Sequence, residues 1–154
     1  MDTMHKYEVR AKATRVRSGV VASDAIAEPI VFSAPPEFSG EPRVWTPEHF
    51  LVASVVACFV STFSGMSDIS KFNFLSLEVE AEGTLERDAT GWKFTEIKLR
   101  PLLKLSQEKD SERGSRLLEK AEKACLIARS ITAKVTLEPE IKVTPEAVLA
   151  AATI

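Results

Sequence analysis

The sequence has little of what metal centres are built from. Its 154 residues include only two cysteines and two histidines. His5 and His49 have no zinc-like spacing to the cysteines, so we expect no metal and no other cofactor. A surplus of basic residues is also absent, because 20 Lys and Arg stand against 22 Asp and Glu. The net charge of −2 gives no excess of basic residues to bind nucleic acid, and we expect no such partner.

Long apolar runs are scarce as well. The first seven residues contain none, so we expect no signal peptide and a cytoplasmic protein. One run, residues 50–66, has about the shortest length that spans a bilayer. Three serines, a threonine and a glycine interrupt it. We therefore expect this run to be buried in a protein core or an oligomer interface, with no membrane as partner.

The rest of the pattern predicts a single α+β domain over residues 1–154. The predicted segments, in order, are a strand meander (1–33), a helix with Cys58 (46–70), a hairpin (75–105), a helix with Cys125 (110–132), a last strand (134–143) and an Ala-rich tail (144–154). The first helix has the clearest start, because Thr46 can cap it and Pro47 suits its first position. The hairpin strands alternate apolar and acidic residues, which indicates one solvated face.

Cys58 and Cys125 both lie within apolar helical patterns, where Ala or Val would pack equally well. In a reducing cytosol a cysteine pair is more often catalytic, redox-active or metal-binding than a static disulfide. Two thiols on different helices could cycle between dithiol and disulfide. The alternative for each is a plain core residue, because free cysteine is among the most buried residue types.

Ionisation of Cys58 needs help from tertiary structure. The residue lies some three turns into its helix, beyond the dipole effect, and apolar surroundings raise a thiol pKa. Arg15, Arg17 and Arg43 are the candidate cations, with Glu48 as their carboxylate partner. Glu48 and Cys58 would be about 15 Å apart on one straight helix. One arginine can contact both only if the helix breaks or a second chain contributes, so we expect an intertwined homodimer.

The segment TPEHFLVASVVACF (46–59) resembles the signature of the OsmC/Ohr family of osmotically induced and organic hydroperoxide resistance proteins. The segment AEKAC (121–125) resembles the second cysteine motif of that family, and the loop over 35–45 is most similar to its OsmC-like branch. The resemblance implies an α+β fold in which antiparallel sheets wrap around central apolar helices of an intertwined homodimer.

The resemblance also implies a thiol-dependent peroxidase that protects against oxidative stress. Cys58 would reduce organic hydroperoxides, and hydrogen peroxide as a further substrate, and become a sulfenic acid. Cys125 would then resolve it as a disulfide, which an external dihydrolipoyl group or small dithiol reduces. The turn RSG matches an Arg-x-Gly turn of the family, so Arg17 is assigned to activate the thiolate, with Arg15 in reserve. Glu48 would orient that arginine.

The second cysteine motif departs from the family. A proline usually follows the cysteine, with a serine two residues further on, whereas this chain has Leu126 and Ala128. We expect Leu126 to continue the helix past Cys125 and to slow disulfide closure.

Four aromatic residues near the first helix belong either to the core or to the mouth of a substrate pocket: Phe38, Trp45, Phe50 and Phe59. At the mouth they would favour bulky organic peroxides. Two other functions stay open on the sequence alone. The protein could be a non-enzymatic dimer that binds a small hydrophobic ligand, or a thiol redox sensor.

Overall fold

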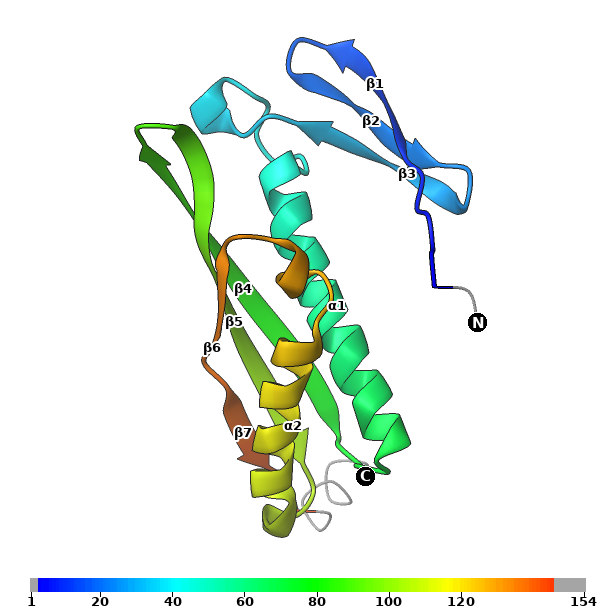
Figure 1. Cartoon of the computed structure of the whole chain (residues 1–154), viewed down its shortest axis with the longest axis vertical. Coiled ribbons are helices and arrows are strands. Elements are labelled where there is room, and N and C mark those ends of the chain that lie inside the picture. The colour runs from blue at the N-terminus through cyan, green and yellow to red at the C-terminus, as the bar shows by residue number, and fades with distance from the viewer. Residues whose placement is uncertain (1–2, 146–154) are drawn as a thin grey trace, which may run out of the picture. The chain divides into compact units, whose positions relative to one another are not determined.

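The computed structural model describes residues 3–145 and has the expected α+β class, with two α-helices and seven strands in that range (Figure 1). The chain divides into two compact units, Met1–Leu51 and Val52–Ile154. The long helix α1 (Pro47–Ile69) begins in the first unit and continues without a break into the second.

The N-terminal unit is built on a three-stranded antiparallel sheet in the order β1-β2-β3. Its strands are β1 (Arg10–Arg15), β2 (Ser18–Ser23) and β3 (Ile26–Ser33). Arg17 occupies the tight turn between β1 and β2 with a left-handed φ of 62°. The loop after β3 contains a short 3₁₀ turn, Pro36–Phe38, and returns to the sheet where the N–H of Ser33 donates to the oxygen of Trp45 at 2.9 Å.

Thr46 caps α1. Its hydroxyl oxygen accepts the main-chain N–H of His49 at 3.1 Å, and its main-chain oxygen accepts the N–H of Phe50 at 3.0 Å. Pro47 follows as the first helical residue, where its missing N–H costs no hydrogen bond.

The second unit contains a hairpin of β4 (Ser76–Asp88) and β5 (Gly91–Leu105). The Asp88 carboxylate closes the turn by accepting the N–H and the hydroxyl of Thr90, at 2.7 and 2.6 Å. Strands β6 (Lys134–Leu137) and β7 (Glu140–Val143) both pair with β5 in parallel, so this sheet is mixed rather than purely antiparallel.

The prediction of one strand over 134–143 was wrong. The run is split after Leu137, because Pro139 has no N–H to donate to a ladder on β5. The last residue before it, Glu138, still donates its N–H to the oxygen of Leu99 at 2.8 Å.

The prediction of a helix over 110–132 was also wrong, because α2 (Ser111–Ala124) ends immediately before Cys125. Cys125 has φ −61° and ψ 111°, an extended conformation, and a 3₁₀ turn follows at Ala128–Ser130. The cause is topological. The chain must reverse after α2 to enter β6 at Lys134, and a helix to residue 132 would leave too few residues for that reversal.

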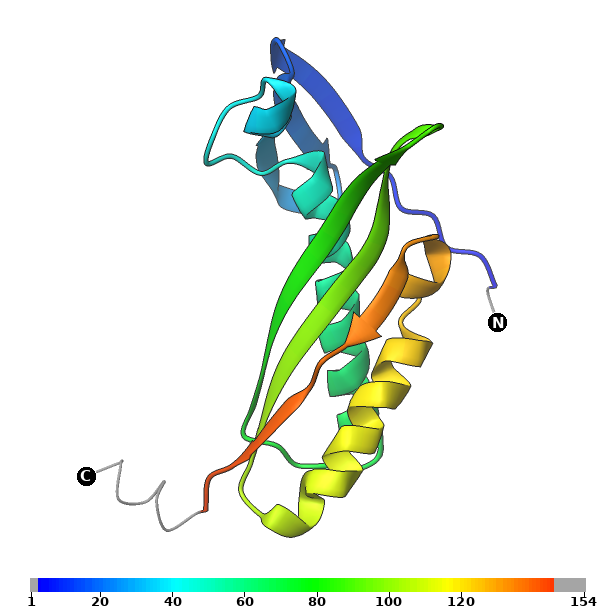
Figure 2. The same ribbon diagram turned by 90° about the vertical axis from the view of Figure 1, so that its left-hand side faces the viewer.

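One apolar core fills the second unit. Every second residue of β5 from Ile97 to Leu105 faces it, and α1 and α2 cover the same face of the sheet (Figure 2). The fully buried side chains include Val55, Phe59, Phe63, Ile97, Leu99, Leu103, Leu118 and Ala121. On the opposite face Glu78, Glu80 and Glu82 are exposed, as the alternation indicates.

Helix α1 has two unlike faces. By length and composition it could cross a membrane, but a core helix passes the same test. Val55, Phe59 and Phe63 pack in the core, whereas Ala57 and Ser61 are exposed. The predicted tail, 144–154, lies outside the described residues from 146 onward.

Candidate functional site

The structure brings the two cysteines together as free thiols in the second unit. Cys58 is half-buried on α1, and Cys125 is buried at the end of α2. The Cys125 sulfur lies 4.0 Å from the main-chain oxygen of Val55 on α1, and the two thiols influence each other's pKa. The hydroxyl of Thr62, one turn along α1, lies 3.9 Å from the Cys58 sulfur.

Hydrogen bonds lower the pKa of the Cys58 thiol below its ordinary value. Burial is the largest single influence and raises this pKa. Four hydrogen-bonding groups lower the pKa and together outweigh burial: the main-chain N–H of Ile127, the thiol of Cys125, the hydroxyl of Thr62 and the main-chain N–H of Leu126. Each donor stabilises negative charge on the sulfur.

The pKa of Cys125 moves the other way. Burial raises it most, and the hydrogen bond with Cys58 and the negative charge there raise it further. The main-chain N–H groups of Ala128 and Ile127 oppose this rise. The pKa values of the two thiols are therefore unequal, with that of Cys58 lowered and that of Cys125 raised.

The arginines and the carboxylate assigned from the sequence all belong to the N-terminal unit. Arg15 forms an exposed ion pair with Glu41 at 2.9 Å. Arg17 lies in the β1–β2 turn, where its main-chain oxygen accepts the N–H of Ala34 at 2.8 Å. Arg43 also has a left-handed φ of 62°. The approach of any of them to Cys58 stays a prediction.

Glu48 lies in the first turn of α1 and carries an unusual feature. Its Oε2 atom is buried and has no hydrogen-bond partner among the described residues. A buried carboxylate oxygen without a donor is unfavourable, so this atom needs a group from elsewhere.

The aromatic residues divide between two environments. Trp45 is 53% exposed, stacks on Phe50 with ring centroids 6.0 Å apart, and lines a hollow with Arg43, Val44 and His49. Phe38 is half-buried in its 3₁₀ turn. Phe59 is fully buried in the core of the second unit, the other interpretation that the sequence allowed.

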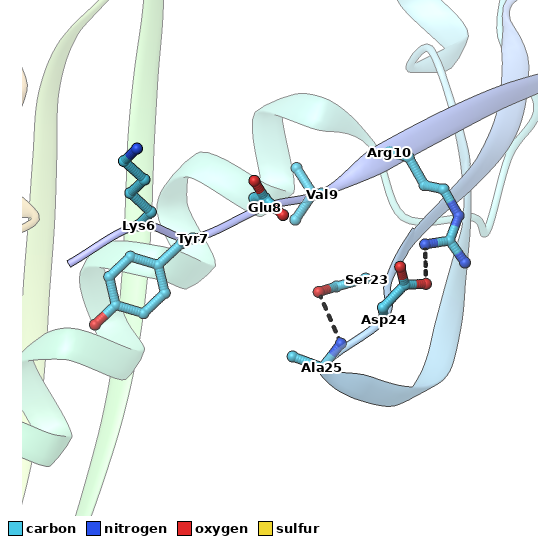
Figure 3. A pocket seen from close by; sticks show the side chains of 8 residues that line it. All are labelled: Lys6, Tyr7, Glu8, Val9, Arg10, Ser23, Asp24 and Ala25. Carbon is cyan, nitrogen blue, oxygen red and sulfur yellow. Dashed lines mark hydrogen bonds and ion pairs between the residues drawn. The ribbon is translucent and has the colours of Figure 1, made fainter.

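Another hollow lies between the N-terminal segment and the β2–β3 turn. Its lining residues, shown in Figure 3, are Lys6, Tyr7, Glu8, Val9, Arg10, Ser23, Asp24 and Ala25. An ion pair between Arg10 and Asp24 closes one side. The hollow contains neither thiol, so it is no part of the cysteine site. Residues 3–145 contain no group of three or more His, Cys, Asp or Glu side chains placed to hold a metal.

Sequence reasoning missed the main-chain donors of Leu126 and Ile127. The sequence pointed to a charged side chain, whereas two main-chain N–H groups in the turn after α2 are among the causes that lower the pKa of Cys58. Every residue except proline has an N–H, so only the absence of proline at 126 was a signal.

Solved structures show the same fold at low sequence identity. An OsmC-like protein of unknown function from Vibrio cholerae aligns with a TM-score of 0.79, at 19% identity, over 89% of this chain and all of that one. An organic hydroperoxide resistance protein OsmC from Legionella pneumophila aligns with a TM-score of 0.71, at 23% identity, over 91% of this chain and all of that one.

Sequence comparison gives the same result. The uncharacterised protein YmaD of Bacillus subtilis is 27% identical over 114 residues, which is 72% of this chain and 76% of that protein. The family model described as OsmC-like protein matches residues 40–140, which include both cysteines. On this evidence from sequence and fold, the chain belongs to the OsmC-like protein family.

Proposed function

We propose that this protein reduces organic hydroperoxides by cycling its two thiols between dithiol and disulfide. The observation that carries the proposal is the position of Cys125, whose sulfur lies 4.0 Å from the main-chain oxygen of Val55, three residues before Cys58 on α1. The pKa of Cys58 is lowered and that of Cys125 is raised, which agrees with the proposal. A peroxide reductase needs one ionised sulfur to attack and a second, protonated sulfur to resolve. Relatives of the same fold, such as the Legionella pneumophila protein, are named organic hydroperoxide resistance proteins.

The proposed cycle has three steps. The Cys58 thiolate attacks the outer oxygen of the hydroperoxide, the O–O bond breaks, and the alkoxide takes a proton and leaves as an alcohol. Cys58 is then a sulfenic acid. The Cys125 sulfur attacks it, the disulfide forms, and the hydroxyl leaves as water. An external dithiol, such as a dihydrolipoyl group, reduces the disulfide by exchange and is itself oxidised.

The end of α2 at Ala124, where the sequence predicted a continuous helix past Cys125, favours this cycle. A Cys125 inside a continuous helix would have little freedom to move. Instead α2 ends at Ala124, and Cys125 is the first extended residue after it. We therefore expect Leu126 to leave disulfide closure fast, in spite of the missing proline.

We further propose that the working unit is a cytoplasmic homodimer. Helix α1 is continuous, so Glu48 and Cys58 lie about 15 Å apart along its axis and no single arginine of the same chain bridges them directly. Glu48 as a residue is half-buried, and its Oε2 has no hydrogen-bond partner within residues 3–145, so its carboxylate is suited to pair with an arginine from a second chain. Several apolar side chains of the N-terminal unit are exposed and available for such a contact: Val9, Val16, Ile26, Ile30 and Val31.

The proposal is tested by peroxidase assays on wild type, Cys58→Ser and Cys125→Ser. The substrates are cumene hydroperoxide, tert-butyl hydroperoxide and hydrogen peroxide, with dithiothreitol or dihydrolipoamide as reductant. Wild type should turn over the organic peroxides fastest. Cys58→Ser should be inactive, and Cys125→Ser should stop at a sulfenic acid that a dimedone probe traps.

Two other results would replace the proposal. Oxidation of Cys58 without turnover, together with a change in shape, would indicate a redox sensor. Binding of an apolar ligand that survives Cys58→Ser, with no turnover in wild type, would indicate a non-enzymatic binding protein.

A further inference from the structure

Two neighbouring hydroxyls of helix α1 both have Cys58 as their partner, but at different atoms. The exposed Ser61 donates its hydroxyl to the main-chain oxygen of Cys58 at 3.0 Å. The half-buried Thr62 has its Oγ1 atom 3.9 Å from the Cys58 sulfur. One hydroxyl therefore serves the main chain of the cysteine, and the other serves its thiol.

The hydrogen bond from Ser61 fills the carbonyl group of Cys58. Helix α1 is continuous from Pro47 to Ile69, so the main-chain oxygen of Cys58 also accepts the N–H of Thr62, four residues later. A carbonyl oxygen has two lone pairs, and these two donors occupy both. The oxygen therefore has no place for a third donor.

This occupancy restricts the hydroxyl of Thr62. In a helix, a threonine hydroxyl can donate to the main-chain oxygen three or four residues before it. For Thr62 these are the oxygens of Phe59 and Cys58, and the second is filled by Ser61. Within residues 3–145, the hydroxyl of Thr62 bonds to neither oxygen and lies beside the sulfur instead. Residues four apart share a helix face, so the two side chains meet without any change in the helix.

Ionisation of Cys58 decides the direction of this contact. While Cys58 is a thiol, either group can be the donor. A thiolate has no proton, so the hydroxyl of Thr62 must then donate to the sulfur. Hydrogen bonds to a charged acceptor are shorter and stronger than neutral ones, so the contact favours the ionised form. Burial raises the pKa of Cys58, and the hydroxyl of Thr62 is among the groups that lower it, which agrees with this direction.

We propose that Thr62 donates its hydroxyl to the Cys58 thiolate in the catalytic cycle, and that Ser61 is a positioning residue that keeps this hydroxyl available by filling the carbonyl oxygen of Cys58. The inference rests on the proposed function, which requires Cys58 to react as a thiolate. It assigns a role to two uncharged side chains of α1 that need no second chain.

The contact is tested by replacing the hydroxyl of Thr62 in the full-length protein. Thr62→Val keeps the branched side chain and removes the hydroxyl, whereas Thr62→Ser keeps the hydroxyl. The ionisation of Cys58 is followed by its rate of alkylation with iodoacetamide against pH, with peptide mass spectrometry to separate it from Cys125. Of the side chains that influence the pKa of Cys58, Cys125 at the end of α2 is the titratable one, and it is left in place in every variant.

We expect Thr62→Val to raise the midpoint of Cys58 by about half a pH unit, and Thr62→Ser to keep it near the wild-type value. Thr62→Val with the wild-type midpoint would overturn the proposal. So would Thr62→Ser with the midpoint of Thr62→Val, because the effect would then come from packing and not from the hydroxyl.

The role of Ser61 is tested with Ser61→Ala, which reopens the carbonyl oxygen of Cys58 to the hydroxyl of Thr62. The midpoint should rise, but by less than in Thr62→Val. Because Ser61 acts through Thr62, the double variant should match Thr62→Val alone. Ser70→Ala is the matched control, since the exposed Ser70 donates to the main-chain oxygen of Met66 at 2.7 Å in the same way. An unchanged midpoint in Ser61→Ala, or additive shifts in the double variant, would refute the role of Ser61.

Kinetics separate this inference from the proposed function. The pH dependence of kcat/KM for cumene hydroperoxide should shift in Thr62→Val by the same amount as the alkylation midpoint. Chemical denaturation and sedimentation should show that each variant keeps the fold and the oligomeric state of wild type. If the midpoints shift while wild type has no peroxidase activity, the roles of the two hydroxyls stand and the proposed function fails. If wild type is an active peroxidase and the midpoints do not shift, the roles of the hydroxyls fail alone.

Discussion

The sulfur of Cys125 lies 4.0 Å from the main-chain oxygen of Val55, to which its thiol donates a long hydrogen bond. Val55 is three residues before Cys58 on α1, and residues three apart share a helix face. The contact therefore places the end of α2 on the face of α1 that carries Cys58. It joins positions 70 residues apart in the sequence.

The two thiols should differ in their pH dependence of reaction. Because hydrogen bonds lower the pKa of Cys58, its thiolate persists below the ordinary thiol pKa and disappears only as the pH falls through the lowered value. Because the pKa of Cys125 is raised, its thiol ionises only in more alkaline solution. Alkylation with iodoacetamide, followed by peptide mass spectrometry, should label Cys58 first at neutral pH. Preferential labelling of Cys125 would contradict the assignment of roles.

Removing the charge of Glu48 should lower activity more than stability. If an arginine of a second chain pairs with the buried oxygen, Glu48→Gln weakens the hold on that arginine and reduces turnover by about ten- to hundredfold. Glu37→Gln changes an exposed acid of the same unit and is the control. If Glu48 is merely a favourable first-turn acid, the two variants will have the same turnover, and only a few tenths of a kcal/mol of stability will be lost.

A charge on the exposed face of α1 should separate the proposed dimer. Sedimentation equilibrium at micromolar concentration should give a wild-type mass about twice the 16.9 kDa of one chain. Ala57→Arg places a long cation on this face and should shift the mass toward one chain. Ala89→Arg, in the exposed hairpin turn, should leave the dimer intact. A single-chain mass for wild type would refute the shared site.

Phe59 and Trp45 should respond differently to truncation. Phe59 is fully buried, so Phe59→Ala should lower the free energy of unfolding by about 3–5 kcal/mol. Trp45 is half exposed beside a hollow, so Trp45→Ala should cost much less stability and should raise KM for cumene hydroperoxide more than for hydrogen peroxide. Chemical denaturation and steady-state kinetics on both variants provide the comparison. An equal change in KM for the two peroxides would remove Trp45 from the substrate pocket.

Local signals were reliable where the structure depends on neighbours in sequence. The cap at Thr46, the proline at the first helical position and the Asp88 turn each work within a few residues, and the pattern reveals them. The end of α2 was missed because no glycine or proline marks it. The pairing of β6 with β5 forces the chain to turn there.

Part of the site was predictable because it depends on local sequence. The motif around Cys58 singles out a thiol, and its apolar helix excludes activation by the helix dipole. The donors that lower its pKa come from Leu126 and Ile127, far along the chain and with no distinctive side chain. No pattern of residue types indicates which main-chain N–H groups will lie near a sulfur far along the chain.

The sequence by itself determined the α+β class, the two thiols and the apolar helices that carry them, because these depend on residue type and periodicity. Only the tertiary structure decided that the end of α2 lies beside the helix that carries Cys58, which thiol has the lowered pKa, and where α2 stops. Those outcomes depend on packing α1, α2 and β5 into one core, which sets the distances between groups far apart in the chain.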